Sequence, residues 1–161
     1  MAGYGTDQGF TDWLAANGYT LAVGAPSAAV LRERGSAYID GAYGTRFSGA
    51  PTGSIAQERA WPRTDATAYG SAIGSDVIPD AIVKASYHAA YAEASAPGSL
   101  SASGSEATRV KREKVEGAVE VEYQAAGAAF SAASLTPVLT TVEGLLAPFL
   151  VPTGVPAVLV V

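Results

Sequence analysis

Apolar residues recur at helical spacing in three stretches of the first hundred residues. In the first stretch, Phe10, Trp13 and Leu14 share one face of a helix. Thr6 is a typical residue to begin that helix, and Asn17-Gly18 is a typical end. The pattern predicts a short helix with one apolar face.

The other two stretches predict longer helices. One begins after Pro26-Ser27 and ends at Gly44, and the other has Pro79 in its first turn and ends at Pro97-Gly98. Their apolar stripes are formed by Val30, Leu31, Tyr38 and Ala42, and by Ile82, Val83, Tyr87, Ala90 and Tyr91. Between these helices, residues 45–77 are rich in Gly, Ser, Thr and Pro and have no sustained period. We expect a long loop held by its aromatic residues, with short helical turns near residues 55–60, and a first candidate contact surface.

A β-hairpin is predicted after a Ser/Gly-rich linker at residues 98–105, because polar and apolar residues then alternate. Glu116-Gly117 fits a two-residue turn. That turn would place Val110 opposite Tyr123 and Lys111 opposite Glu122.

The C-terminal part is strongly apolar. Thr136-Pro137 can open a fourth helix of about three turns with a wide apolar face. Beyond residue 150, Pro152 and Pro156 interrupt any helix, so we expect an extended tail. Leu135 to Val161 could also be a membrane anchor, but Glu143 and four prolines oppose a span of roughly 20 residues. Docking on a protein partner is the favoured interpretation, and no membrane association is expected.

The expected fold class is mainly α, a small helical bundle with a β-hairpin and an extended apolar C-terminal tail. We divide the chain into a helical body at 1–98 with the aromatic loop 45–77, a hairpin at 105–124, and a C-terminal helix and docking tail at 128–161. A chain of 161 residues has room for one domain with a substantial core.

Composition narrows the function classes. Only 16% of the residues are charged and the net charge is −5, so a general attraction to phosphate backbones is not expected without a local basic patch. With no cysteine, the chain has no disulfide, no thiolate zinc site and no thiol nucleophile. The first ten residues lack the basic start and apolar run of a signal peptide, so secretion by that route is not expected.

Candidate catalytic chemistry is sparse. His88 is the only histidine and lies on an alanine-rich helix, where packing or simple exposure is the better explanation. The carboxylates fit helix starts and polar faces, and the glycine-rich pieces match no phosphate-binding loop. We therefore expect no enzyme, and no catalytic, cofactor-binding or metal-binding residues.

One basic cluster has two interpretations. Its residues are Arg109, Lys111, Arg112 and Lys114. With Tyr123 they could bind single-stranded nucleic acid. Alternatively they form a solvated strand face or a basic rim at a subunit interface, paired with Glu120 and Glu122. The acidic strand neutralises the cluster, so the second interpretation is favoured.

Five motifs occur in an order typical of one family. They are YGT, LRERGSAYIDGAYGTRF, QERAWPRTDA, VIPDAIVKASYHAAY and VKREKVEGAVEVEY. Between about Tyr4 and Tyr123, the chain resembles tailed-phage and prophage proteins often named DnaT-like single-stranded-DNA-binding proteins. These proteins are also similar to the head-tail connectors, or adaptors, of long-tailed phages.

This resemblance implies a ring of about twelve copies beneath the portal protein, at the virion neck. Further implied partners are the next neck, stopper or tail protein and genomic DNA, which passes through the lumen without sequence specificity. The subunit would be made in the host bacterial cytoplasm. In related adaptors a C-terminal extension reaches the portal, which the segment from Leu135 to Val161 would suit, although it lies outside the matched region.

The leading hypothesis is thus a non-catalytic head-tail adaptor, and the rival is a single-stranded-DNA-binding module using the basic cluster and Tyr123. For the adaptor, the expected portal-docking residues are Leu139, Val142, Leu146, Phe149, Leu150 and Val155. The expected ring and neck contacts are Arg59, Trp61, Arg63, Arg109, Lys111, Arg112, Lys114, Glu120 and Glu122. Trp61 is expected to act as an anchor, in an interface or in the core.

Overall fold

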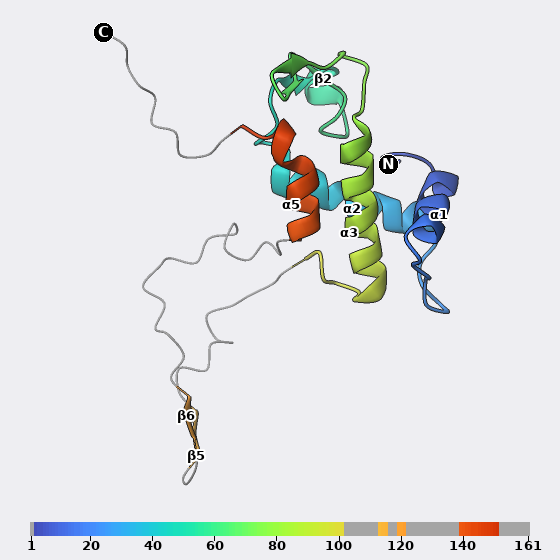
Figure 1. Cartoon of the computed structure of the whole chain (residues 1–161), viewed down its shortest axis with the longest axis vertical. Helices are drawn as coiled ribbons and strands as arrows, with labels where there is room; N and C mark the ends of the chain where they lie inside the picture. The colour runs from blue at the N-terminus through green and yellow to red at the C-terminus, as the bar shows by residue number, and fades with distance from the viewer. Residues whose placement is uncertain (1, 102–112, 116–118, 122–138, 152–161) are drawn as a thin grey trace.

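The computed structural model describes residues 2–101, 113–115, 119–121 and 139–151. Its helices are α1 (Asp7–Ala16), α2 (Ala28–Tyr43), α3 (Asp80–Ser95) and α5 (Thr140–Leu146), the last continued by the 3-10 turn η3 (Ala147–Phe149). The predicted fold, mainly α with a β-hairpin, is confirmed. In Figure 1, α2 crosses α3, with α1 on one side of the pair and α5 on the other.

Two helix starts follow from their capping residues. Thr6 Oγ1 accepts a hydrogen bond from the Gly9 amide at 2.9 Å, and Ser27 Oγ accepts one from the Val30 amide at 3.5 Å. Both predicted starts are therefore confirmed. Pro79 is the N-cap of α3, whereas we expected it to lie within the first turn of that helix. Residues 136–138 lie outside the described residues, and α5 begins at Thr140.

Two clusters of apolar side chains hold the helices together. The main cluster joins α2, α3, α5 and the aromatic loop. Its buried members are Tyr4, Tyr38, Ile39, Tyr43, Phe47, Trp61, Ala66, Ile82, Ala85, Ala89, Val142, Leu146 and Phe149. The second cluster joins α1 to α2 and α3 through Phe10, Leu14, Leu31, Tyr87 and Ala90. Thus α1 packs on the body through a cluster of its own.

Small residues bring α2 and α3 into close contact. A Cβ added at Gly35 of α2 would lie 2.3 Å from the Ser86 carbonyl oxygen and 2.7 Å from the Ala90 amide nitrogen of α3. Backbone atoms cannot yield as a flexible side chain can. Glycine at this position therefore sets the distance between the two helices.

Gly35→Ala is expected to lower the free energy of unfolding by about 1–3 kcal/mol, because the added methyl forces α2 and α3 apart. Gly41→Ala is the matched control on the same helix, since its added Cβ would meet nothing within 4 Å. The control is expected to be neutral or to stabilise by up to about 1 kcal/mol through helix propensity. Urea denaturation of both variants measures the difference, and equal effects would contradict the close contact.

The aromatic loop contains paired strands that the sequence did not predict. Strand β1 (Ala50–Pro51) pairs with β2 (Arg63–Thr64), and β3 (Thr67–Ala68) pairs with β4 (Ser71–Ala72), both antiparallel. The expected helical turn exists as η1 (Ser54–Ala56). Strands of two residues are too short to show an alternating pattern, so only a loop could be predicted.

The β-hairpin consists of β5 (Glu113–Val115) and β6 (Val119–Val121). Three residues, 116–118, separate the strands, so the predicted two-residue turn was wrong by one position. The observed register places Lys114 opposite Glu120 and Val115 opposite Val119, whereas the predicted turn would have matched Lys114 with Val119. Opposite charges and β-branched pairs at facing positions favour the observed register.

Candidate functional site

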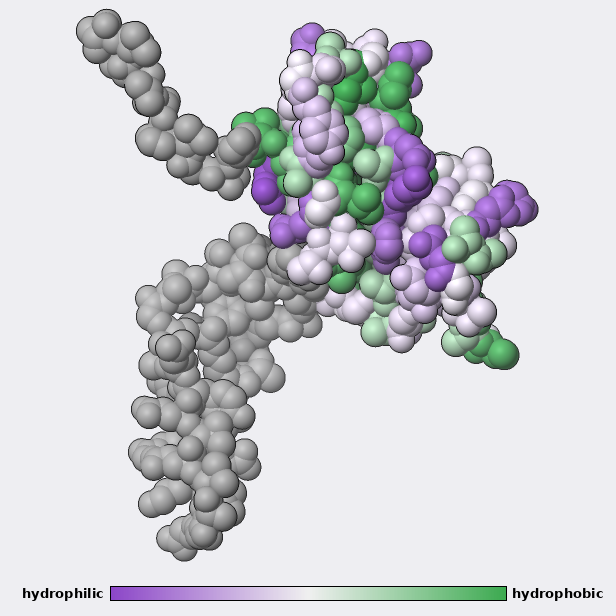
Figure 2. Space-filling view, viewed as in Figure 1, coloured by the Kyte–Doolittle hydropathy of each residue, from purple (hydrophilic) through white to green (hydrophobic). Residues whose placement is uncertain are grey.

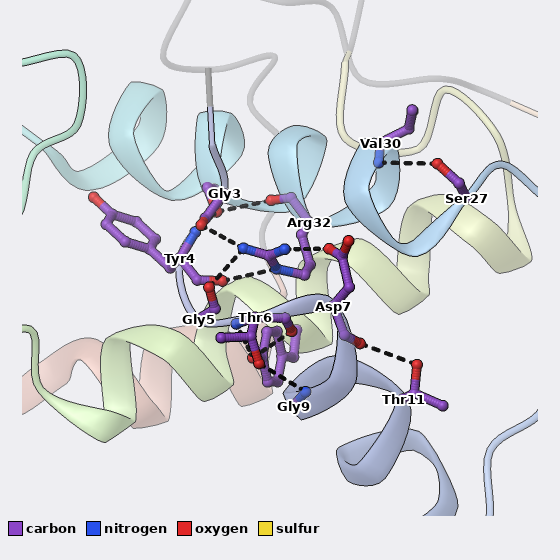
Figure 3. Close-up of polar contacts among 12 residues, drawn as sticks. Gly3, Tyr4, Gly5, Thr6, Asp7, Gly9, Thr11, Ser27, Val30 and Arg32 are labelled. Carbon is purple, nitrogen blue, oxygen red and sulfur yellow. Dashed lines mark hydrogen bonds and ion pairs between the residues drawn. The ribbon is translucent and has the colours of Figure 1, made fainter.

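Arg32 of α2 clamps the N-terminal segment. Its guanidinium donates hydrogen bonds to three consecutive carbonyls, at 2.6 Å to Gly3, 3.1 Å to Tyr4 and 2.6 Å to Gly5, and it forms an ion pair with Asp7 (Figure 3). Arg32 is only 7% exposed. A buried guanidinium needs such partners, because a charge without them would be very costly inside a protein.

Three further residues complete the hold on this segment. Arg59 Nε donates to the Ala2 carbonyl at 3.0 Å, Tyr87 Oη donates to the Thr6 carbonyl at 3.2 Å, and Ser36 Oγ accepts from the Tyr4 amide at 2.8 Å. Every carbonyl from residue 2 to residue 6 thus accepts a hydrogen bond from a side chain. We call Arg32, Ser36, Asp40, Arg59 and Tyr87 the N-terminal clamp.

Asp40 belongs to the clamp through the ring of Tyr4. The Tyr4 hydroxyl donates to Asp40 Oδ1 and accepts from the Trp61 amide at 3.2 Å, while Arg59 Nη1 lies 3.3 Å from Asp40 Oδ2. Burial raises the pKa of Tyr4, and it raises the pKa of Asp40 although Arg59 and the hydrogen bonds act in the opposite direction. Tyr4, only 3% exposed, is therefore an anchor that links the N-terminus to the aromatic loop.

Two positions of the bound segment, Gly3 and Gly5, leave no room for a side chain. A Cβ at Gly3 would lie 2.6 Å from the Arg32 carbonyl carbon and oxygen, and one at Gly5 would lie 2.1 Å from Tyr87 Oη. Gly5 also has a φ of +69°. The site therefore fits an extended Gly-Tyr-Gly main chain with one aromatic side chain inserted.

Arg63 plays the same part inside the aromatic loop. It donates to the carbonyls of Phe47, Ser48, Gly49 and Ala60 at 2.7–3.3 Å and is 5% exposed. Burial lowers the pKa of its guanidinium. The neighbouring Trp61, 1% exposed, is the largest fully buried side chain, and its ring packs edge-on against Phe47 and Phe149.

The structure thus places the side chains of Arg59, Trp61 and Arg63 in the interior of the chain. Their side chains fix the N-terminus and the aromatic loop, with side-chain exposure of 11% for Arg59. The role in ring or neck contacts that the sequence suggested for them stays a prediction. No local pattern in the sequence indicated this structural role.

The residues predicted to dock on a portal mostly pack within the chain. Val142 and Leu146 of α5 are fully buried, Phe149 is 7% exposed, and Leu139 and Leu150 pack against the main cluster. Leu150 also forms a β-bridge with Phe47. Val155 lies outside the described residues. The docking role stays a prediction.

The predicted basic cluster and its acidic partners lie in or beside the hairpin. Only the backbone of Lys114 and Glu120 is described, as facing positions of β5 and β6. Arg109, Lys111, Arg112, Glu122 and Tyr123 lie outside the described residues. Residues 106–122 contain four basic and five acidic residues, so this stretch carries no excess of positive charge.

The cations of the described body already have partners. Arg34 pairs with Glu93 at 3.1 Å, Lys84 pairs with Asp80 at 2.7 Å, and Arg46 lies 5.7 Å from the centre of the Tyr43 ring. The other three cations, Arg32, Arg59 and Arg63, are the interior ones already described. Residues 2–101 hold nine acidic residues against these six basic ones. The described body therefore presents no run of free cations along which a phosphate backbone could lie.

The exposed part of the aromatic loop is mostly polar, but it includes a few large apolar side chains. Ile55 is 101% exposed, Tyr69 is 88% exposed, and Val77 at the end of the loop is 44% exposed, while Ile78 just beyond it is 38% exposed. Figure 2 shows hydrophobic and hydrophilic residues interspersed at the end of the body where this loop lies. Within the described ranges, no helix is long and apolar enough to cross a membrane and no cluster of side chains is suited to hold a metal ion. Ile55 and Tyr69 are therefore exposed apolar side chains of the loop that are available for protein contacts.

A second aromatic group lies between α1 and α3. The Trp13 ring meets His88 edge-on with centroids 4.7 Å apart, and Tyr19 stacks on Tyr91 at 4.2 Å. All four side chains are partly exposed. Burial lowers the pKa of His88, in line with packing, which was one of the two alternatives expected for it.

Comparison with known proteins supplies one match. The profile of a family described as "Putative DnaT-like ssDNA binding protein" matches residues 3–160, which is nearly the whole chain. No match was found among curated proteins or among solved structures. The match includes the Gly-Tyr-Gly segment, both arginine sites and the hairpin. The chain therefore belongs to the DnaT-like ssDNA-binding protein family.

Proposed function

We propose that the chain is a non-catalytic assembly subunit, a head-tail adaptor that forms a ring on a portal protein at the virion neck. The order of its motifs supports this proposal, as do the exposed side chains of Ile55 and Tyr69 in the aromatic loop. Charge-poor surfaces with exposed aromatic residues are typical of protein-protein interfaces.

The main support for the proposal is that the arginines of the described body make contacts within their own chain. Arg32, Arg59 and Arg63 bind backbone carbonyls inside the body, and Arg34 is paired with Glu93. These residues stiffen the N-terminus and the loop and leave no basic groove on the described body. A rigid, weakly acidic body is suited to a ring through which DNA slides, because a strongly basic lumen would retain phosphates.

The test mixes the purified chain with the portal protein from the same genome and examines the products by electron microscopy and native mass spectrometry. Rings seated on the portal are expected. A truncation after Val151 is the suitable test of the tail, because it keeps α5 in the main cluster. A tail that docks on the portal predicts loss of portal binding in this truncation, and absence of binding by the full chain would contradict the adaptor proposal.

The second candidate is single-stranded-DNA binding, and the family description favours it over the adaptor. The basic cluster from Arg109 to Lys114 and the aromatic group between α1 and α3 would provide phosphate contacts and stacking surfaces. Binding through this cluster would be salt-dependent. The logarithm of the binding constant would fall with the logarithm of the salt concentration, with a slope of about −0.7 for each phosphate contact.

Replacing Arg109, Lys111, Arg112 and Lys114 by glutamine separates the two candidates. If these cations bind single-stranded DNA, the replacement should abolish the salt-dependent affinity, as measured by fluorescence anisotropy with a labelled oligonucleotide. If the chain is an adaptor without DNA affinity, the wild type and the variant should both leave the oligonucleotide free. Replacing Glu113, Glu116, Glu120 and Glu122 by glutamine is the matched control, and it should strengthen binding only in the first case.

A further inference from the structure

The N-terminal clamp is constructed as a site for a peptide. It binds the main chain of residues 2–6 through side chains of α2, α3 and the aromatic loop, and it buries the single anchor Tyr4. Recognition of an extended segment by main-chain hydrogen bonds and one side-chain pocket is a common mode of peptide binding. In the structure, the chain's own N-terminus occupies this site.

The bound segment belongs to a separate module. Residues 2–21 comprise the clamped segment, α1, and the turn after it in which the Tyr19 amide donates to the Leu14 carbonyl at 2.9 Å. Tyr4 is the residue of this module that reaches the main cluster, while Phe10 and Leu14 pack in the second cluster. Figure 1 shows α1 on the side of α2 and α3 that lies away from α5.

The connection between this module and α2 has few contacts. Ala22, Val23 and Gly24 are exposed, with Val23 at 107%, and one turn bond joins the Ala25 amide to the Ala22 carbonyl at 3.0 Å. Gly24 has a φ of +86°. Opening this turn would leave the module's internal contacts and its binding site unchanged.

We propose that residues 2–21 are an exchangeable arm, which binds the N-terminal clamp and second cluster of a neighbouring copy when two copies lie side by side. Each arm would make the same contacts with the neighbouring copy that it makes with its own chain. The free energy of the exchanged pair therefore differs from that of two separate copies mainly by the opening of one turn in each chain. The occupant is specific, because Gly3, Tyr4 and Gly5 fit the clamp as no other sequence of the chain does. The inference goes beyond the proposed function and does not depend on a portal or on DNA.

The absence of cysteine allows a direct test on full-length protein. Tyr19 lies on the arm and Tyr91 on α3, with stacked rings 4.2 Å apart and both partly exposed. A Tyr19→Cys chain and a Tyr91→Cys chain are mixed at high concentration, partly unfolded with urea, refolded, and treated with a short thiol cross-linker. Exchange predicts a covalent pair of one chain of each kind, visible by mass.

The controls make the result decisive. A chain carrying both cysteines, kept dilute, should cross-link within itself, which shows that the pair is in reach. If the double-cysteine chain cross-links within itself but the mixture gives no product that joins two chains, the arm stays bound to its own chain and the proposal is overturned.

A second variant tests the hinge without altering the clamp. Deleting Val23 and Gly24 removes the residues that close the exposed turn, and shortened hinge connections favour exchange over closure within one chain. The deletion is expected to convert monomers into dimers, as measured by analytical ultracentrifugation. A deletion variant that remains a folded monomer would overturn the proposal, whatever the outcome with the portal protein.

Discussion

Replacing Arg32 by alanine is expected to lower the free energy of unfolding by about 3–5 kcal/mol. The substitution leaves the carbonyls of Gly3, Tyr4 and Gly5 and the carboxylate of Asp7 without their donor. Buried acceptors that lose a partner bear the cost of their lost hydration. Urea denaturation followed by circular dichroism measures the change.

Arg34→Ala is the matched control for this prediction. Arg34 lies two residues away on the same helix, its side chain is 49% exposed, and its ion pair with Glu93 is partly open to solvent. Glu93 is buried, but its carboxylate also accepts hydrogen bonds from the amides of Gly98 and Leu100, so the control is expected to cost clearly less than Arg32→Ala. If the two substitutions cost the same, the clamp does not hold the N-terminus as described.

Replacing Trp61 by alanine is the second large expected effect, a loss of about 3–5 kcal/mol. The ring is 1% exposed and fills the space between Phe47 and Phe149, so its removal leaves a cavity where the aromatic loop meets η3. Thermal and urea unfolding measure the loss.

Tyr69→Ala controls for the loss of an aromatic residue from the same loop. Tyr69 is 88% exposed, so its truncation is expected to change the stability by less than about 0.5 kcal/mol. An interface role of Tyr69 would instead weaken assembly on the portal while leaving the monomer stable. A stable Trp61→Ala monomer that fails only in assembly would show that Trp61 acts as an interface anchor and not as part of the core.

The helices could be predicted from the sequence because their signals are local. Thr6 and Ser27 are capping residues directly before apolar stripes, and Gly18 and Gly44 lie just beyond the helix ends. The register of the hairpin was predicted one position away, because a glycine in the turn does not by itself distinguish two loop residues from three.

The clamp could not be predicted, because its contacts join distant parts of the chain. Arg32 meets carbonyls 27 to 29 residues away, and Tyr87 meets Thr6 across 81 residues. An arginine in the sequence does not reveal whether its guanidinium faces a phosphate, a carboxylate or a row of carbonyls. For the same reason the sequence did not show that Arg59 and Arg63 bind carbonyls of their own chain, and their role in ring or neck contacts stays a prediction.

The apolar face of α5 shows a similar limit. Val142, Leu146 and Phe149 were recognised as one face, but the sequence did not show whether that face meets a partner or the body of the same chain. The structure packs them into the main cluster, which explains why a truncation that removes α5 would test stability and not docking.

Because Arg32, Arg59 and Arg63 bind carbonyls of their own chain, we expect the described body to offer no surface for nucleic acid. The most direct measurement is the affinity of the full chain for a labelled single strand at several salt concentrations. With Arg109, Lys111, Arg112 and Lys114 replaced by glutamine, only the cations of the body remain, and we expect no salt-dependent binding stronger than a non-specific Kd of about 10⁻⁴–10⁻⁶ M at physiological salt. Tight binding that weakens steeply with salt, and that persists when Arg109, Lys111, Arg112 and Lys114 are replaced by glutamine, would contradict this expectation.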